Sequence, residues 1–219
     1  MAGTTGAASA VLDLLSARRV APDPDGPPPS SADLETVLRA ATSVPDHGRL
    51  HPWRFVVVTG AGRAALGDAL AAAVVEARPD APEATVVKAR GKPMAAPTVI
   101  VLIASPVAGS NVPLCEQHAS AACCGYAMVL AGSALGLGAV WKSAGVLAGD
   151  RLRHVLSLGP DEVVFGWILL GARSGGASPG PRPEVPLAQV ASVLDGDRPV
   201  AAWDTAEVED HRRTPADRQ

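Results

Sequence analysis

Aromatic side chains are scarce in this sequence, which has 4 tryptophans, 2 phenylalanines and 1 tyrosine among 219 residues. Alanine and glycine are abundant instead, and apolar residues reach 47% of the chain. That content is enough for the core of one domain, but helices faced with small residues each bury little surface. We therefore expect the chain to gain burial by self-association, most simply as a homodimer.

Cysteine is also rare, and the 3 cysteines Cys115, Cys123 and Cys124 form no C-x-x-C pair. An odd number without that spacing argues against a disulfide framework and against a thiolate zinc site. We expect buried, unpaired thiols in a reducing compartment, which points to the cytoplasm.

Charge of one sign is nowhere concentrated, and the formal net charge is only -3. No basic run with interleaved aromatic residues is present, so nucleic-acid binding has no electrostatic support. Residues 1–10 lack the charged and apolar regions of a signal peptide, which agrees with a cytoplasmic location.

One uncharged stretch, residues 119–141, is long enough to span a membrane. Its glycines, alanines and serines make it only weakly lipophilic, and such small residues also suit close packing between helices in water. A buried central helix is therefore favoured over a membrane span, although a small membrane-associated helical protein stays open as a distant alternative.

Hydrophobic periodicity and turn residues predict alternating helices and strands. The pattern indicates one domain over 6–195, in which 171–195 forms an outward arm, followed by a flexible tail over 196–219. A strand or short helix is expected over 186–194. The predicted helices are 6–19, one that starts at Ser30, 63–78, 82–93, 113–135 and 150–158, and the predicted strands are 53–58, 98–104, 139–142 and 162–170.

Several common catalytic and binding motifs are missing. The chain has no G-x-S-x-G nucleophile elbow and no phosphate-binding P-loop, and "GLGAVWK" does not match the G-x-G-x-x-G of a dinucleotide fold. His47 and His51 have the spacing of a helical metal pair, but Pro45 and Pro52 bracket them, so this loop does not hold helical phase and a metal site is not favoured.

The remaining candidate binding residues are basic side chains at the ends of predicted helices and strands. Arg18 and Arg19 end the first helix, where they either complement the helix dipole or capture a phosphate through paired guanidinium donors. Lys142 follows Trp141 at the end of an apolar strand, where its charge needs a partner or a pocket mouth. The residues alone leave these alternatives open.

The order of these motifs resembles the FMN-dependent nitroreductase family, and in particular its short bacterial branch. The likeness covers roughly residues 9 to 175 and rests on six stretches: "SARRV" (16–20), "VPDHGRLHPWRF" (44–55), "KARGKPMAAPTVIVLIA" (88–104), "EQHASAACCGYAM" (116–128), "GLGAVWKSAG" (136–145) and "VVFGWILLGA" (163–172). It implies an α+β fold with a mixed, mainly antiparallel sheet flanked by helices. It also implies an intertwined homodimer in which the arm over 171–195 reaches the partner subunit, with the central helix at the subunit interface.

The resemblance also implies a cofactor site for FMN built from three groups of residues. No residue is assigned a catalytic role, although His47 is a candidate proton donor beside water. The family usually has serine where this chain has Val20, so a hydroxyl contact is lost there. The implied site consists of Arg18, Arg19 and Val20 at the phosphate, Ser43 and His47 reaching the flavin from the other subunit, and Trp141, Lys142 and Ser143 lining its ring.

The function implied by the resemblance is a two-electron oxidoreductase. NADH or NADPH would reduce FMN and leave, and a nitroaromatic, quinone or similar small acceptor would then take the electrons, in a ping-pong sequence. Two alternatives share every motif: a protein that binds or sequesters FMN with little turnover, and a tailoring oxidase of a biosynthetic pathway.

Overall fold

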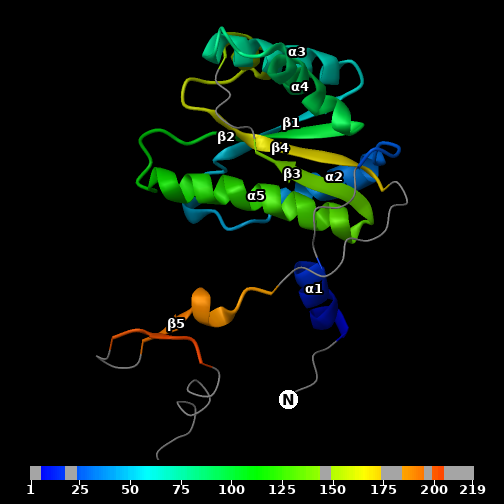
Figure 1. Cartoon of the computed structure of the whole chain (residues 1–219). Coiled ribbons are helices and arrows are strands. Elements are labelled where there is room, and N and C mark those ends of the chain that lie inside the picture. The colour runs from blue at the N-terminus through cyan, green and yellow to red at the C-terminus, as the bar shows by residue number, and fades with distance from the viewer. Residues whose placement is uncertain (1–5, 18–23, 144–148, 174–183, 195–198, 205–219) are drawn as a thin grey trace, which may run out of the picture. The chain divides into compact units, whose positions relative to one another are not determined.

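The computed structural model describes residues 6–17, 24–143, 149–173, 184–194 and 199–204. The chain forms two compact units that divide between residues 180 and 181, and each is described here by itself. Figure 1 shows the first unit as a sheet between two helical layers.

The first unit is built on a four-stranded sheet with the order β1-β2-β4-β3. Every pairing in this sheet is antiparallel, so the predicted mainly antiparallel sheet is confirmed. The central strand β2 is buried along its whole length, as its continuous apolar sequence predicts. The strands are β1 (Trp53–Thr59), β2 (Thr98–Ala104), β3 (Leu137–Lys142) and β4 (Val163–Ala172).

Helices cover both faces of this sheet. Helices α3 and α4 lie on one face, and α2 and α5 lie on the other (Figure 1). Helix α6 packs against α3. The helices are α1 (Gly6–Ala17), α2 (Ser31–Ala41), α3 (Gly62–Ala77), α4 (Glu83–Gly91), α5 (Leu114–Ala134) and α6 (Asp150–Leu156), with short 3₁₀ turns η1 (His47–Arg49), η2 (Lys92–Ala95) and η3 (Leu187–Gln189).

Side-chain alternation along β2 divides the core into two clusters. Val99, Val101 and Ile103 pack toward α3 and α6, whereas the residues between and after them pack toward α2 and α5. On the second face, α5 approaches the sheet closely because it has Gly132 at the contact. A Cβ atom there would lie 2.7 Å from the Cβ of Ala139.

The uncharged stretch 119–141 thus runs from α5 into β3. Helix α5 is a core helix. Its buried residues include Ala121, Cys124 and Met128, and no helix among the described residues is both long enough and apolar enough to cross a bilayer. The expectation of three buried thiols is wrong, since Cys115 and Cys123 are exposed on α5. Burial raises the pKa of the Cys124 thiol to about 12, which makes it an unreactive packing residue.

Local sequence signals account for most element ends. Ser30 caps α2 as predicted, because its hydroxyl accepts a hydrogen bond from the Asp33 N–H at 3.1 Å. The single helix expected over 82–93 instead ends at Gly91 and continues as a 3₁₀ turn, because Pro93 lacks the N–H that a continuing helix needs.

The Pro-rich connector before α2 runs along the end of β4. The Gly26 N–H donates to the Ala172 carbonyl at 3.2 Å, and the Ala172 N–H donates to the Pro27 carbonyl at 2.8 Å. Strand β2 pairs with β4 only as far as Leu170. The connector therefore supplies hydrogen-bond partners for β4 beyond the reach of β2.

The second unit contains η3 and a short ribbon of β5 (Ser192–Val193) and β6 (Ala201–Ala202). Both expected structures over 186–194, a short helical turn and a strand, are present. The Trp203 N–H donates to the Ala191 carbonyl at 3.0 Å and closes this ribbon. Within the described part of this unit, large apolar side chains are exposed at Val185, Leu187, Val190, Leu194 and Val200.

Candidate functional site

Several connecting segments meet at one end of the sheet. The register aligns Trp53 at the start of β1 with Ala104 at the end of β2, and Ala104 with Val163 at the start of β4. The loop over 43–52, the segment after β2 and the turn before β4 therefore share this end. Strand β3 also ends in this direction, with Lys142.

The loop over 43–52 has a strained backbone. Gly48 has a φ of 74°, and the non-glycine residues Arg49 and His51 have φ values of 53° and 49°. Left-handed conformations at non-glycine residues cost energy and are often kept at functional sites. The loop then enters β1 at Trp53, which is only 8% exposed and anchors the strand in the core.

Contacts with α5 hold this loop in place. The Ser120 hydroxyl donates to the Pro45 carbonyl at 2.5 Å, and the His47 Nδ1 lies 2.7 Å from Glu116 Oε2. His51 lies beside a different carboxylate, because its backbone N–H donates to Asp46 Oδ2 at 2.9 Å and its imidazole Nε2 lies 4.0 Å from the same oxygen. The two histidines therefore face different carboxylates.

Ser43 stands at the start of the same loop. Its hydroxyl donates to the Ala40 carbonyl at 2.8 Å, which ties it to the last turn of α2. The side chain is exposed, so a hydroxyl oxygen remains accessible as an acceptor. Ser43 therefore lies at the end of α2, whereas His47, later in the same loop, contacts Glu116 in the first turn of α5.

Trp141 and Lys142 point to opposite faces of the sheet. A Cβ atom on Gly125 of α5 would lie 3.1 Å from the Trp141 ring, so this indole packs against α5. Lys142 is paired with Trp167, which belongs to the cluster on the other face. Lys142 and Ser143 are exposed, whereas Trp141 is half-buried. The structure therefore does not present the Trp141 and Lys142 side chains to a common surface.

A bulge in β4 shapes this end of β3. The β2–β4 register shifts between Leu102 and Ile103, and Gly166, opposite Leu102, has a φ of 145°. A Cβ atom on Gly166 would lie 2.4 Å from the Lys142 carbonyl oxygen and 2.7 Å from Trp141 Nε1. Glycine is therefore required where β3 and β4 approach each other beside the candidate site.

The predicted flavin residues form two groups within one chain. Strands β1 and β3 are the opposite edges of the sheet, and three strand spacings separate them by about 14 Å. Ser43 and His47 precede β1, whereas Lys142 and Ser143 end β3, so a single sheet does not bring the two groups together. Arg18, Arg19 and Val20 lie outside the described residues.

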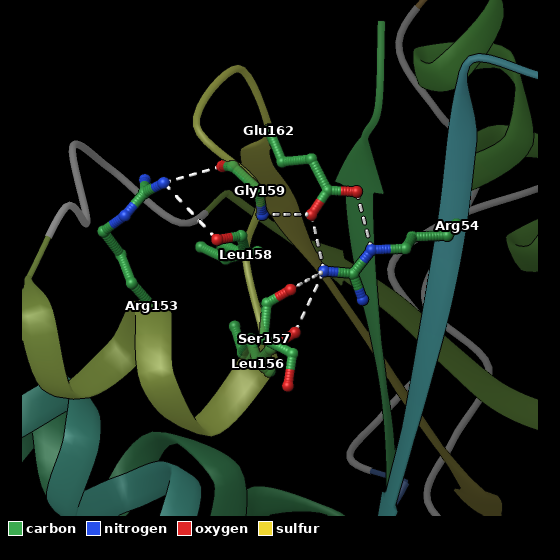
Figure 2. A network of polar contacts seen from close by, with 7 residues as sticks. All are labelled: Arg54, Arg153, Leu156, Ser157, Leu158, Gly159 and Glu162. Carbon is green, nitrogen blue, oxygen red and sulfur yellow. Dashed lines mark hydrogen bonds and ion pairs between the residues drawn. The ribbon is translucent and has the colours of Figure 1, made fainter.

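An ion pair stabilises the turn before β4 (Figure 2). The sequence alone does not predict it. Arg54 on β1 donates to both carboxylate oxygens of Glu162, at 2.7 and 2.6 Å. The same guanidinium donates to the carbonyls of Leu156 and Ser157, at 2.9 and 3.0 Å. The Arg54 hydrogen bonds outweigh desolvation and lower the pKa of Glu162 to about 2.

A hollow of about 430 Å³ opens at the same end of the sheet. The Gln117 side chain shapes it by accepting from the Val107 N–H at 2.8 Å and donating to the Val112 carbonyl at 3.0 Å. Its volume lies within the range of small-molecule pockets, about 300–1,000 Å³. The imidazole of His118 and the carboxylate of Asp161 are among its polar lining groups.

These features place the chain among α+β proteins whose exposed polar groups gather at one end of an antiparallel sheet. The sequence matches the model of the Nitroreductase family over residues 24–172. It is also 32% identical over 160 residues to "Putative NAD(P)H nitroreductase YdjA" of Escherichia coli strain K12, which covers 73% of this chain and 86% of that relative. The chain therefore belongs to the nitroreductase family.

Solved structures agree with this assignment at the level of the fold. A nitroreductase-like family protein from Bacillus cereus superimposes with a TM-score of 0.72 at 21% identity, covering 90% of this chain and 100% of that one. An FMN- and NADPH-dependent nitroreductase, NfnB, from Sphigopyxis sp. strain HMH gives a TM-score of 0.67 at 22% identity, with 84% and 99% covered. The predicted family and α+β fold are confirmed, and they support the general class of NAD(P)H-dependent oxidoreductase.

Proposed function

We propose that two copies of this chain bind FMN and pass two electrons from NADH or NADPH to a nitroaromatic, quinone or similar small acceptor. The observation that carries the proposal is the placement of exposed polar groups beside both edge strands of the sheet, at the same end, in the order of the family motifs. Ser43 and His47 of one subunit would face Lys142 and Ser143 of the other, because within one chain the two groups adjoin opposite edge strands of the sheet, which are about 14 Å apart.

The chemistry of the donors fits FMN. A flavin edge carries carbonyl oxygens, ring nitrogens and one ring N–H. The Lys142 ammonium, the Ser143 hydroxyl and the His47 imidazole can donate to the acceptors, and the Ser43 hydroxyl oxygen can accept from the N–H. Arg18 and Arg19 would hold the phosphate as paired guanidinium donors. Around the ring, the backbone of Trp141 and the side chains of Lys142 and Ser143 would supply contacts, since the indole itself packs against α5.

Bound FMN would supply the two-electron redox chemistry that no protein side chain provides. The protein's own groups position it and set its electrostatics. The Lys142 ammonium would stabilise negative charge at the flavin edge, where a water-poor cleft strengthens the attraction. NAD(P)H and the acceptor would use one cleft in turn, which is a ping-pong sequence.

Exposed apolar side chains support the proposed homodimer with exchange of the C-terminal arm over 171–195. Val11, Leu12 and Leu15 are exposed on α1, and five large apolar residues are exposed in the second unit. Leu114 and two thiols are exposed along α5. A second copy that covers these surfaces would supply the burial that the small-residue core lacks.

The test of FMN binding is a visible spectrum of the purified protein after loading with FMN. We expect Arg18→Ala to weaken FMN binding by about 10- to 100-fold, because a hydrogen-bonded charge is worth about 1.5–3 kcal/mol. Arg78→Ala, which removes an exposed guanidinium at the end of α3, is the matched control. A colourless wild-type protein, or equal FMN affinity in both variants, would contradict this assignment.

We expect Lys142→Met to lower the reduction potential of the bound flavin by about 30 mV or more, which is about 1.4 kcal/mol for a two-electron couple. The reason is the loss of a cation that favours the reduced, more negative flavin. The measurement is a reductive titration against a reference dye. Lys88→Met on the exposed end of α4 removes the same charge elsewhere, and a similar potential in both variants would remove Lys142 from this role.

Val20, in place of the usual serine, leaves room for a protein that holds FMN without turnover. Oxidation of NADH or NADPH in the presence of a quinone or nitroarene separates the two functions. Steady turnover supports the enzyme, whereas tight FMN binding with no acceptor-dependent oxidation supports the sequestering protein.

The unpaired thiols fit the proposed cytoplasmic location, because reducing conditions keep thiols reduced.

A further inference from the structure

Glu116 holds the imidazole of His47 at one defined nitrogen. His47 Nδ1 lies 2.7 Å from Glu116 Oε2, across 69 positions of sequence. An ionised carboxylate only accepts hydrogen bonds, so the hydrogen in this contact belongs to Nδ1. Nδ1 is therefore protonated in both the neutral and the charged imidazole, and Nε2 is the nitrogen that gains or loses a proton.

The position of Glu116 on α5 suits this role. Glu116 lies in the first turn of α5, where the helix dipole favours a carboxylate. Ser120 lies one turn later and binds the Pro45 carbonyl. Helix α5 thus fixes both the backbone of the strained loop and the ring that the loop carries.

The contact contributes little to stability, since the His47 and Glu116 side chains are 67% and 48% exposed and such surface pairs are worth about 0–1 kcal/mol. Its main effect is to orient the His47 ring. Nε2 has no partner among the described residues and faces away from the carboxylate that binds the opposite side of the ring. It is available to a group that arrives from outside the chain.

We propose that Glu116 is a positioning residue that holds the His47 ring through Nδ1–H, so that the imidazolium form of His47 donates its Nε2 proton to the oxygen of the bound acceptor. This inference rests on the proposed function, which supplies the two electrons and places His47 beside the cofactor. In the step, the Nε2–H bond breaks and an O–H bond forms on the reduced acceptor. The imidazolium thereby becomes a neutral imidazole with its Nδ1–H in place, and a hydronium ion from solvent returns a proton to Nε2 before the next turnover.

The direct test is ¹⁵N NMR of the FMN-loaded, full-length protein labelled at histidine, with His47→Gln used to assign the His47 signals. In the wild type we expect a single neutral tautomer with the proton on Nδ1. Glu116→Ala should give a mixture of both tautomers, whereas Glu116→Gln should keep the Nδ1–H form because its amide oxygen still accepts. Glu83→Ala, in the first turn of α4, removes an equivalent exposed carboxylate as the matched control.

Turnover adds a second readout. At metal sites, loss of the carboxylate that orients a ligating histidine costs about 10- to 100-fold. By analogy, we expect kcat of Glu116→Ala to fall by about tenfold, with KM for the acceptor nearly unchanged. Glu116→Gln should recover most of kcat. An unchanged His47 tautomer in Glu116→Ala, or a shifted tautomer with wild-type kcat, would overturn the inference. Failure of the wild type to bind FMN would instead refute the proposed function, and the spectrum distinguishes these results.

Discussion

Replacing Arg54 with alanine is expected to lower the free energy of unfolding by about 3 kcal/mol. The variant leaves the Glu162 carboxylate, which is only 12% exposed, without its cation. It also removes the donor to the Leu156 and Ser157 carbonyls. A largely buried charge that loses its partner keeps most of its desolvation cost. Urea or thermal unfolding of wild type and variant at neutral pH measures the difference.

The pH dependence of this difference has a defined sign. The folded pKa of Glu162 is about 2, below its ordinary value of 4.5. A depressed carboxyl pKa contributes stability that is complete above the ordinary pKa and is lost as pH falls toward the folded pKa. The gap between wild type and Arg54→Ala should therefore narrow between pH 4.5 and pH 2.

The exposed pair of Arg39 and Glu35 on α2 provides a control for the Arg54 result. Both side chains are well exposed and lie one helical turn apart, so Arg39→Ala should cost only about 0.3–0.5 kcal/mol. Equal losses of unfolding free energy in Arg54→Ala and Arg39→Ala would show that the Arg54 network does not stabilise the turn before β4. A gap that stays constant with pH would refute the role of Glu162.

Gly166→Ala is expected to destabilise the protein by about 2–4 kcal/mol and to weaken FMN binding as well. Alanine is strained at a φ of 145°, and its Cβ would collide with the Lys142 carbonyl oxygen at 2.4 Å. That oxygen is backbone, so it moves only if β3 and β4 separate. Thermal unfolding and FMN titration together test whether the bulge positions the end of β3.

Gly91→Ala is the matched control for this substitution. Gly91 ends α4, and a Cβ atom there would meet no atom within 4 Å. Because alanine also favours the helix, this variant should be neutral or more stable by up to about 1 kcal/mol. If Gly166→Ala changes stability and FMN binding no more than Gly91→Ala does, the close approach at the bulge does not require glycine.

The sequence predicts the elements of this fold well because their signals are local. The apolar run of β2, the Ser30 cap and the uncharged stretch of α5 are each decided by neighbouring residues. Arg54 and Glu162 are 108 positions apart, and only the register of β1, β2 and β4 brings them together. No local sequence pattern identifies such a pair. The contact between His47 and Glu116 cannot be predicted from the sequence for the same reason.

The candidate site was only partly accessible to sequence reasoning. The motifs locate Ser43, His47 and Lys142 at element ends, and the structure places them there. The period of two along a strand would have shown that Trp141 and Lys142 face opposite sides. The bulge at Gly166 offered a weaker signal, since an isolated glycine inside a strand pattern indicates a bulge or a close backbone approach.

The hydrogen bonds between the Pro-rich connector and Ala172 join the two ends of the stretch that matches the family, residues 24–172. These hydrogen bonds, which we call the clasp, hold the two ends of this stretch side by side, so the stretch is a closed module. Its ends are the natural places to cut and rejoin the chain. A circular permutant that links residues 24 and 172 and opens a surface turn elsewhere should therefore retain the sheet, and the segments outside the clasp can vary in length without altering its register.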